Sequence, residues 1–167
     1  MKELKNKVVL ITGAAGGIGL NTAGFFAEAG SRLVLTDINE VALENAKQRL
    51  AKHGVDILAK VVDVTDLKAV EKLRDDVLQK FGTLDILINN AGIGYNAEIA
   101  DTPLSKWQQL MNINFWAPLY HIQAFLPLMK ERKSGHIVNV SSGQAYFRAP
   151  TWGAYSVTKL AVGAMSE

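Results

Sequence analysis

The sequence contains no cysteine among its 167 residues. Disulfides, thiolate nucleophiles and zinc sites with cysteine ligands are therefore excluded. Histidine is scarce, and the three residues present, His53, His121 and His136, lie far apart and form no HxH or HxxxH pair. We therefore expect no metal site. We interpret His121 as a helix-face or interface residue rather than a catalytic one.

Long apolar runs and a surplus of one charge are also absent. No run approaches the ~18 residues of a membrane span, and the apolar run after the lysine-rich start is too short for a signal peptide. Eighteen Lys and Arg residues against sixteen Asp and Glu residues give a formal net charge of +2. No basic cluster suggests a nucleic-acid-binding surface. We predict a cytoplasmic protein that binds neither membranes nor nucleic acids.

The overall composition is that of an ordinary globular domain, with 49% hydrophobic and 20% charged residues. A chain of this length buries roughly two-thirds of its surface on folding. Residues 1–167 show no internal repeat, no low-complexity tract and no linker. The sequence thus predicts a single domain.

Five short segments rich in Val, Ile and Leu are apolar nearly throughout, which is typical of strands buried on both faces of a parallel sheet. They are Lys7–Thr12, Arg32–Asp37, Asp56–Val62, Leu84–Asn89 and His136–Ser141. Longer segments with a helical spacing of apolar residues lie between and after them. This alternation predicts an α/β fold in which right-handed crossovers place helices on both faces of a doubly wound parallel sheet.

The expected helices cover Ile18–Ala29, Glu40–His53, Asp66–Phe81, roughly Leu104–Arg132, and Tyr155–Ser166. Asn39 and Thr65 are expected N-caps of the second and third helices. The first three helices are followed by glycines suited to a left-handed C-cap: Gly30, Gly54 and Gly82. The fourth helix contains Pro118 and Pro127, which predict a kink or a break.

A glycine-rich turn follows the first strand and opens the first helix. Its sequence, Thr12-Gly13-Ala14-Ala15-Gly16-Gly17-Ile18-Gly19, has the spacing T-G-x-x-x-G-x-G. Glycine lets backbone N–H groups approach a phosphate closely, and a helix N-terminus favours an anion. We therefore predict that Gly13, Gly17, Ile18 and Gly19 bind a pyrophosphate. The alternative is a glycine-rich turn without a ligand.

Asp37 ends the second strand, eighteen residues after Gly19. A carboxylate at this point can accept both ribose hydroxyls of an adenosine, and it repels a 2′-phosphate. Since Ile38 and Asn39 follow it and position 15 is Ala, no cation is offered to that phosphate. NAD is therefore favoured over NADP; the alternative is a helix-capping or loop acid.

Asp63 and Val64 follow the third strand and carry a weaker signal. They are expected to border the adenine, although Asp63 also suits an ordinary turn.

Tyr155 and Lys159 lie four residues apart, so both face the same side of the last helix. Ser142 follows the fifth strand, thirteen residues before Tyr155, and Asn89-Asn90-Ala91-Gly92 ends the fourth strand. In a doubly wound sheet, the carboxyl ends of the strands face one ligand crevice. These groups are therefore expected on the same side as the glycine-rich turn.

Together these motifs resemble the short-chain dehydrogenase/reductase family. The resemblance rests on TGAAGGIG (12–19), NNAG (89–92), Asn114 in MNINFWAP, Ser142 and YSVTK (155–159), and it extends from Lys5 to Glu167. It implies a Rossmann-type sheet, expected here in the strand order 3-2-1-4-5. It also implies NAD(P)-dependent oxidation of an alcohol or reduction of a ketone, and a homodimer or homotetramer formed through the last two helices.

The resemblance further implies a catalytic tetrad of Asn114, Ser142, Tyr155 and Lys159. Asn90, Ala91 and Gly92 would border the cofactor, as would Tyr155 and Lys159.

Elementary chemistry agrees with these roles. A free phenol, with a pKa of about 10, is a poor base near pH 7, and a nearby ammonium favours the phenolate. Ser142 would hydrogen-bond the substrate oxygen beside Tyr155, and Asn114, near Pro118, would hold a water that leads to Lys159. The alternatives are a plain strand-end hydroxyl for Ser142 and an ordinary helix asparagine for Asn114.

The sequence leaves several points open. Tyr146, Phe147 and Trp152 are expected either to line a substrate pocket or to pack the loop before Tyr155. Members of the family usually continue into sixth and seventh strands, so we expect that the chain, which stops at Glu167 inside a helix, belongs to a longer one. A catalytically silent dinucleotide-binding or interaction module is the alternative function. The sequence does not name the substrate.

Overall fold

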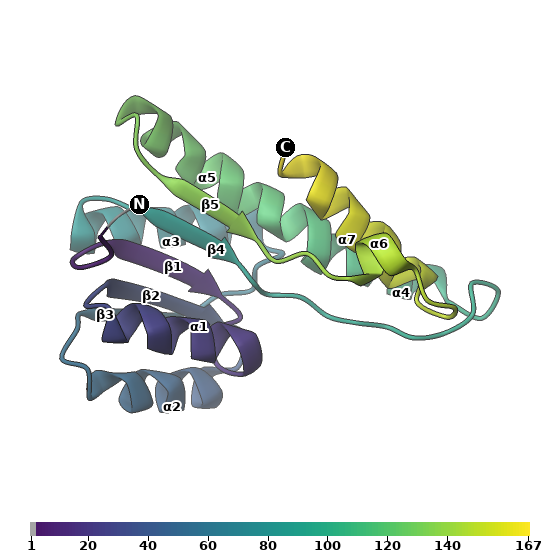
Figure 1. The fold of residues 1–167 in the computed structure, drawn as a ribbon, viewed down its shortest axis with the longest axis horizontal. Helices are drawn as coiled ribbons and strands as arrows, with labels where there is room; N and C mark the ends of the chain where they lie inside the picture. Colours follow the sequence, from purple (N-terminus) through teal and green to yellow (C-terminus); the bar gives the residue numbers. More distant parts are fainter. Residues whose placement is uncertain (1–2) are drawn as a thin grey trace.

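The computed structural model describes residues 3–167, which form one five-stranded parallel sheet flanked by helices (Figure 1). The strand order is β3-β2-β1-β4-β5, as predicted. The strands are β1 (Val8–Thr12), β2 (Arg32–Asp37), β3 (Ile57–Val61), β4 (Ile86–Asn89) and β5 (His136–Asn139). In the register, Leu10 of β1 pairs with Val34 of β2 on one side and with Leu87 of β4 on the other.

The two faces of the sheet are covered by different helices, which explains why the central strands are apolar throughout. The prediction of burial on both faces is wrong for the edge strand β5, where His136 and Val138 are exposed. Val8 and Leu10 of β1 pack into a core with α3 (Leu67–Phe81) and α5 (Ala117–Glu131). Val9 and Ile11, which point to the other face, pack with α1 (Gly17–Glu28) and α2 (Glu40–Ala51). All five residues of β1 are buried.

One predicted helix cap is confirmed and the other is wrong. The Asn39 side chain accepts the Ala42 N–H at 3.0 Å and caps α2. Asp66, rather than Thr65, caps α3, because its carboxylate reaches two free N–H groups of the first turn. The Thr65 hydroxyl instead donates to Asp63 at 2.7 Å. Positive φ angles are confirmed at all three glycines that follow helices: Gly30, Gly54 and Gly82.

The predicted long helix is interrupted at one of its two prolines. It consists of α4 (Leu104–Met111), a π-helical turn η1 (Asn112–Trp116) and α5. Within η1 the Ala117 N–H donates to the Asn112 carbonyl, five residues back. Pro118, in the first turn of α5, has no N–H to continue the α-helical pattern. Pro127 lies inside α5 without ending it.

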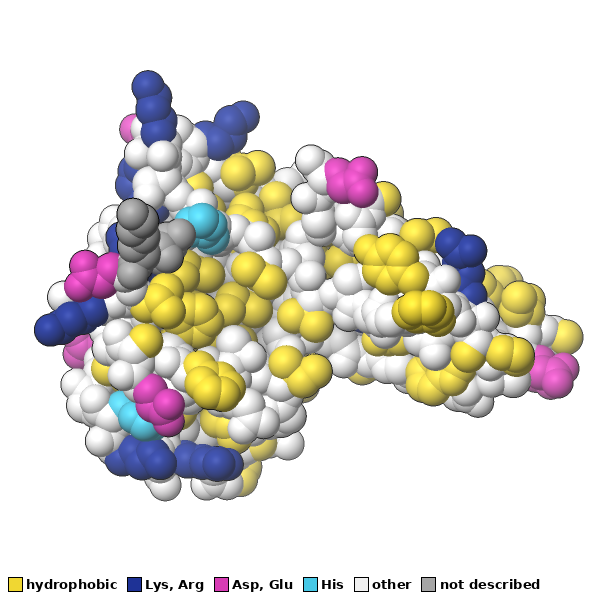
Figure 2. Space-filling view, viewed as in Figure 1, with side chains coloured by type: hydrophobic (Ala, Val, Ile, Leu, Met, Phe, Trp, Pro, Cys, Tyr) yellow, Lys and Arg dark blue, Asp and Glu magenta, His cyan; other side chains and the backbone are white. Residues whose placement is uncertain are grey.

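Two further helices follow β5: α6 (Gln144–Phe147), which the sequence did not predict, and α7 (Gly153–Met165). In Figure 1 they lie with α4 at the end of the molecule away from α2. Figure 2 shows hydrophobic side chains over this end, whereas Lys and Arg gather mainly at the other. Tyr146 is 73% exposed and Phe147 is 87% exposed, so these rings do not pack the loop.

No helix within residues 3–167 is both long enough and apolar enough to cross a membrane.

Candidate functional site

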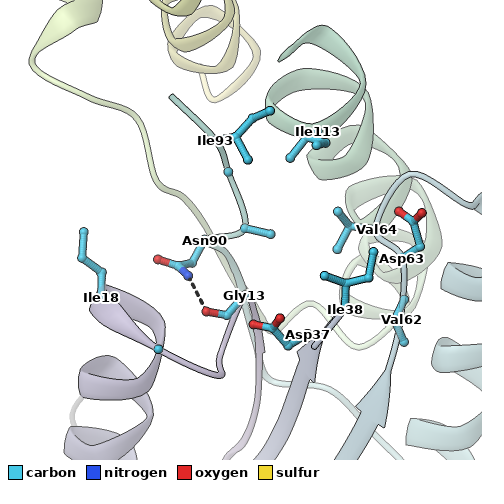
Figure 3. Close-up of a pocket in the computed structure, with 13 residues that line it drawn as sticks. Gly13, Ile18, Asp37, Ile38, Val62, Asp63, Val64, Asn90, Ile93 and Ile113 are labelled. Carbon is cyan, nitrogen blue, oxygen red and sulfur yellow. Dashed lines mark hydrogen bonds between the residues drawn. The ribbon is translucent and has the colours of Figure 1, made fainter. Parts of the chain in front are cut away.

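The carboxyl ends of β1, β2 and β4 surround a cavity of about 490 Å³ (Figure 3). It is lined by Gly13, Gly16, Ile18, Asp37, Ile38, Val62, Asp63, Val64, Asn90, Ala91, Gly92, Ile93 and Ile113. Figure 3 shows Asp37 on one side of this space and Ile93 and Ile113 on the opposite side. The cavity thus gathers most of the residues that the sequence predicts for cofactor binding.

Glycine is required at two points of the turn after β1. Gly13 has a φ of +63°, and a Cβ there would come within 2.9 Å of the Ala91 Cα. A Cβ on Gly19 would overlap the Gly13 carbonyl oxygen. Gly17, with a φ of +52°, and Gly19 shape the turn without lining the cavity, while Gly16, which was not predicted to bind the cofactor, lines it. The result is an open backbone cradle at the N-terminus of α1.

The segment after β4 is tied directly to the glycine-rich turn. The Thr12 hydroxyl oxygen accepts the N–H groups of Asn90 and Ala91, both at 3.0 Å. The Asn90 amide donates to the carbonyls of Thr12 at 2.9 Å and Gly13 at 3.1 Å; Figure 3 marks the second of these bonds. The two strand ends therefore form one rigid wall of the cavity.

Asp37 is held at the edge of the cavity by two backbone groups. One carboxylate oxygen accepts the Ala15 N–H and the other accepts the Asn39 N–H, each at 3.0 Å. Since Asn39 caps α2, the capping role considered for Asp37 is wrong. None of the thirteen lining residues in the described chain is Lys or Arg.

Asp63 lies in a turn and also lines the cavity. One of its carboxylate oxygens accepts the Thr65 N–H at 2.9 Å and the Thr65 hydroxyl at 2.7 Å. Val64 lines the cavity beside it. Both interpretations of Asp63, turn acid and cavity residue, are thus compatible with its position.

Lys159 is a buried cation beside Tyr155. Its side chain is 5% exposed, and Nζ donates to the Val140 carbonyl at 2.7 Å. Nζ lies 5.9 Å from the centroid of the Tyr155 ring. Burial lowers the pKa of Lys159 below its usual range, because the charged form loses hydration.

Asn114 lies in η1 and is 1% exposed. Its Oδ1 accepts the Ile93 N–H at 2.9 Å, and its Nδ2 donates to the Ile93 carbonyl at 2.9 Å and to Thr158 Oγ1 at 3.0 Å. The side chain thus joins η1, the segment after β4, and α7. The predicted disruption of the helix near Pro118 coincides with this π-helical turn.

Gly92 connects the cavity to these residues. It lines the cavity, and a Cβ placed on it would lie 3.1 Å from Asn114 Oδ1 and 3.4 Å from Lys159 Nζ. The missing side chain of this glycine therefore brings the lining of the cavity close to the buried ammonium.

Ser142 and Tyr155 follow β5 on the same side of the sheet. Ser142 Oγ accepts the Gln144 N–H at 3.2 Å, which leaves its own proton free to be donated. The Tyr155 ring makes an edge-to-face contact with Trp152, with centroids 5.5 Å apart. A Cβ on Gly94 would lie 3.3 Å from the Trp152 ring, so Trp152 packs between Tyr155 and this second loop.

Four apolar residues that line the cavity were not predicted from the sequence: Ile38, Val62, Ile93 and Ile113. Ile38 directly follows the predicted second strand and Val62 ends the predicted third strand, which is the signal that was available, whereas Ile93 comes four residues after the predicted fourth strand. Ile113 precedes Asn114 in η1, and only the fold brings it to the cavity.

Within residues 3–167, no group of three His, Asp or Glu side chains is arranged to hold a metal ion. His121 is buried inside α5, with Nδ1 bonded to the Ala117 carbonyl at 2.9 Å.

Comparison with known proteins agrees with this geometry. The family model for short chain dehydrogenases matches residues 7–167. An uncharacterised oxidoreductase of Staphylococcus saprophyticus is 38% identical over 167 residues, which cover 100% of this chain and 67% of that protein. The CLA biosynthesis dehydrogenase/reductase of Lactiplantibacillus plantarum is 35% identical over 168 residues, which cover 100% of this chain and 59% of that protein.

Solved structures agree over nearly the whole chain. An NAD⁺-bound xylitol dehydrogenase has a TM-score of 0.95 at 36% identity, covering 98% of this chain and 64% of its own. A metagenomic short-chain oxidoreductase in complex with NADP has a TM-score of 0.92 at 29% identity, covering 97% and 74%. This chain therefore spans about 60–74% of the length of these proteins. The chain belongs to the short-chain dehydrogenase/reductase family of oxidoreductases, as its motifs predicted.

Proposed function

We propose that the chain transfers a hydride between a nicotinamide cofactor and an alcohol or ketone, with Tyr155 as the general acid and base. The observation that carries the proposal is the placement of a buried ammonium, Lys159, 5.9 Å from the Tyr155 ring and beside Gly92 of the cavity. A phenol next to a buried cation that lies close to a cavity-lining glycine is suited to proton transfer at an alcohol oxygen.

The residues of the cavity fit a dinucleotide. The close packing at Gly13 and Gly19 leaves no room for a Cβ and keeps the turn tight, while a Cβ placed on Gly16 or Gly17 would meet nothing within 4 Å. The first turn of α1 offers free N–H groups to a pyrophosphate. Asp37 is fixed where a ribose would lie, and Ile38, Val64 and Ile113 supply apolar walls for an adenine. A nicotinamide cofactor, when bound, accepts or supplies the hydride.

Tyr155 and the residues around it have different roles in the proton transfer. In alcohol oxidation, the Tyr155 phenolate removes the hydroxyl proton; in ketone reduction, the phenol returns it. Lys159 stabilises the phenolate by its charge. Ser142 donates a hydrogen bond to the substrate oxygen, since Oγ accepts the Gln144 N–H and its own proton stays free. Asn114 fixes the segment that carries Gly92.

We further propose that NAD is preferred over NADP. Asp37 is anchored by two backbone N–H groups, so its carboxylate cannot turn away easily from a 2′-phosphate. The lack of Lys and Arg among the described lining residues supports the same preference. The structural relatives include one bound to NAD⁺ and one bound to NADP, so the preference rests on this chain's own residues.

We also propose that two or more copies associate through α5 and α7. Leu126, Val157 and Leu160 on these helices are 37%, 49% and 44% exposed, which leaves an apolar face uncovered. The mass in solution, measured by light scattering, tests this: a dimer or tetramer is expected, and a monomer would contradict it.

The test of function separates binding from turnover. Calorimetry with NAD and NADP measures binding, and nicotinamide absorbance over a panel of secondary alcohols and ketones measures turnover. Binding with turnover of at least one alcohol–ketone pair is expected. Binding without turnover of any pair would favour the silent dinucleotide-binding module, and no binding would contradict the cofactor site.

A further inference from the structure

We propose that Thr158 is a positioning residue that couples the catalytic helix α7 to the π-helical turn η1 through the side chain of Asn114. The inference rests on the proposed function, because the role assigned to Thr158 is to hold Tyr155 and Lys159 in a fixed position relative to the segment that borders the cavity. Thr158 lies between these two residues in the sequence, but its side chain faces a different partner.

The hydroxyl of Thr158 makes two hydrogen bonds in a completely buried position, since the residue is 0% exposed. Oγ1 donates to the Tyr155 carbonyl at 2.7 Å. A hydroxyl has only one proton, and a carbonyl can only accept, so Oγ1 must face Asn114 as an acceptor. The bond from Asn114 Nδ2, at 3.0 Å, has this polarity.

This contact fixes the orientation of the Asn114 amide. With one amide proton on Thr158 and the other on the Ile93 carbonyl, Oδ1 must point to the Ile93 N–H, where a 2.9 Å bond is found. Both amide protons of Asn114 are then donated inside the protein, and Oδ1 accepts one hydrogen bond there. Asn114 therefore acts on the reaction by holding segments together rather than by offering a free amide proton.

A chain of contacts thus runs from the Tyr155 backbone through Thr158 and Asn114 to Ile93. Gly92, the neighbour of Ile93, lies against both Asn114 Oδ1 and Lys159 Nζ. Valine has nearly the shape of threonine but no hydroxyl, so Thr158→Val would leave a buried amide proton of Asn114 without its acceptor. Loss of this hydrogen bond would let η1 and α7 move apart. The positions of Tyr155 and Lys159 relative to Gly92 would then change.

The test compares three variants of the chain: Thr158→Val, Thr158→Ser, which keeps the hydroxyl, and Thr102→Val. Thr102 is a matched control, because it is also buried and its hydroxyl also donates to a backbone carbonyl, that of Glu98, at 2.7 Å. We expect kcat to fall between about 10-fold and about 100-fold in Thr158→Val, with the KM for NAD unchanged. The acidic limb of the kcat/KM profile should move to higher pH, and Thr158→Ser should restore both quantities.

A second measurement does not depend on turnover. Proton exchange of the Asn114 side-chain amide, followed by NMR in the cofactor-free protein, should be faster in Thr158→Val than in wild type and unchanged in Thr102→Val. Wild-type kcat and pH profile in Thr158→Val, or unaltered amide exchange, would overturn the role of Thr158. A wild-type chain that turns over no substrate would contradict the proposed function instead, and the exchange measurement alone would then decide whether Thr158 holds Asn114.

Discussion

The part of the molecule that precedes Ile93 and the part that follows it are built by different means. In the first, backbone groups shape the cavity: glycines at 13 and 19, and the N–H groups that fix Asp37. In the second, side chains reach across to distant backbone carbonyls, as in the bond between Lys159 and Val140. The binding half therefore depends on bare backbone at its glycines, fixed by the side chains of Thr12 and Asn90, and the proton-transfer half depends on side chains that carry the chemistry.

The largest effect is expected in the second part, from Lys159→Met. Because the phenolate loses its nearest cation, we expect kcat/KM at neutral pH to fall by about 100-fold or more and the acidic limb of the profile to move to alkaline pH. Lys106→Met is the control, since Lys106 also lies over a tyrosine ring, that of Tyr95 at 5.8 Å. An unchanged profile at saturating NAD would contradict the electrostatic role of Lys159.

The same residue predicts a pH dependence of folding. Burial lowers the pKa of Lys159 in the folded protein, so the unfolded chain binds the proton more tightly. The free energy of unfolding should therefore rise with pH up to the ordinary lysine value of 10.5. Urea unfolding at several pH values should show this contribution in wild type and its loss in Lys159→Met.

In the first part, Gly19→Ala tests whether an absent side chain is essential. Its Cβ would overlap the Gly13 carbonyl, so we expect a loss of about 1–3 kcal/mol in the free energy of unfolding and weaker NAD binding. Gly24→Ala, in the same helix with open space around its Cβ, should be neutral or stabilising. Equal effects of the two substitutions, measured by urea unfolding and calorimetry, would contradict a built cradle.

A smaller effect is expected when the cofactor preference is reversed. Asp37→Ser combined with Ile38→Arg removes the repelling carboxylate and offers a planar cation to the 2′-phosphate. The ratio of KM values should shift toward NADP by about tenfold or more. Tighter binding of NADP than of NAD by the unaltered protein would show that the role of Asp37 is wrong.

The smallest effect concerns His121, a buried residue of the second part with no acidic partner among its described contacts. Burial lowers its pKa below 6.5, and the bond to the Ala117 carbonyl opposes this only in part. The folded state thus loses stability as pH falls below about 6.5, by at most about 1.4 kcal/mol per pH unit. His121→Leu should remove this slope and His136→Gln, at an exposed position, should keep it; thermal unfolding between about pH 5 and pH 7 measures both.

The two parts also differ in how well the sequence predicted them. The strand order, the glycine-rich turn and the place of Asp37 were predicted, because apolar strands and glycine spacing are local signals. The exact helix cap was not: a carboxylate at Asp66 competes with the hydroxyl at Thr65, and only the backbone geometry decides between them.

In the second part, Lys159 lies close to Tyr155 as their spacing predicted, but the sequence did not indicate which groups hold Lys159 and Asn114 in place. Val140 and Thr158 contact Lys159 and Asn114 through folding alone, across 19 and 44 residues of sequence. A proline predicted the interruption near residue 118, but proline does not specify a π-helical turn. Contacts of this kind can be identified only in the folded structure, because no local sequence pattern indicates which backbone carbonyl will accept a hydrogen bond from Lys159.

The most direct test of the account is Tyr155→Phe, which removes only the ionisable oxygen. Tyr146→Phe, at a position that is 73% exposed, is the matched control. With a substrate identified from the alcohol and ketone panel, NAD should bind Tyr155→Phe with unchanged affinity while kcat falls by about 100-fold or more. A kcat near the wild-type value would contradict the assignment of Tyr155 as the residue that transfers the proton.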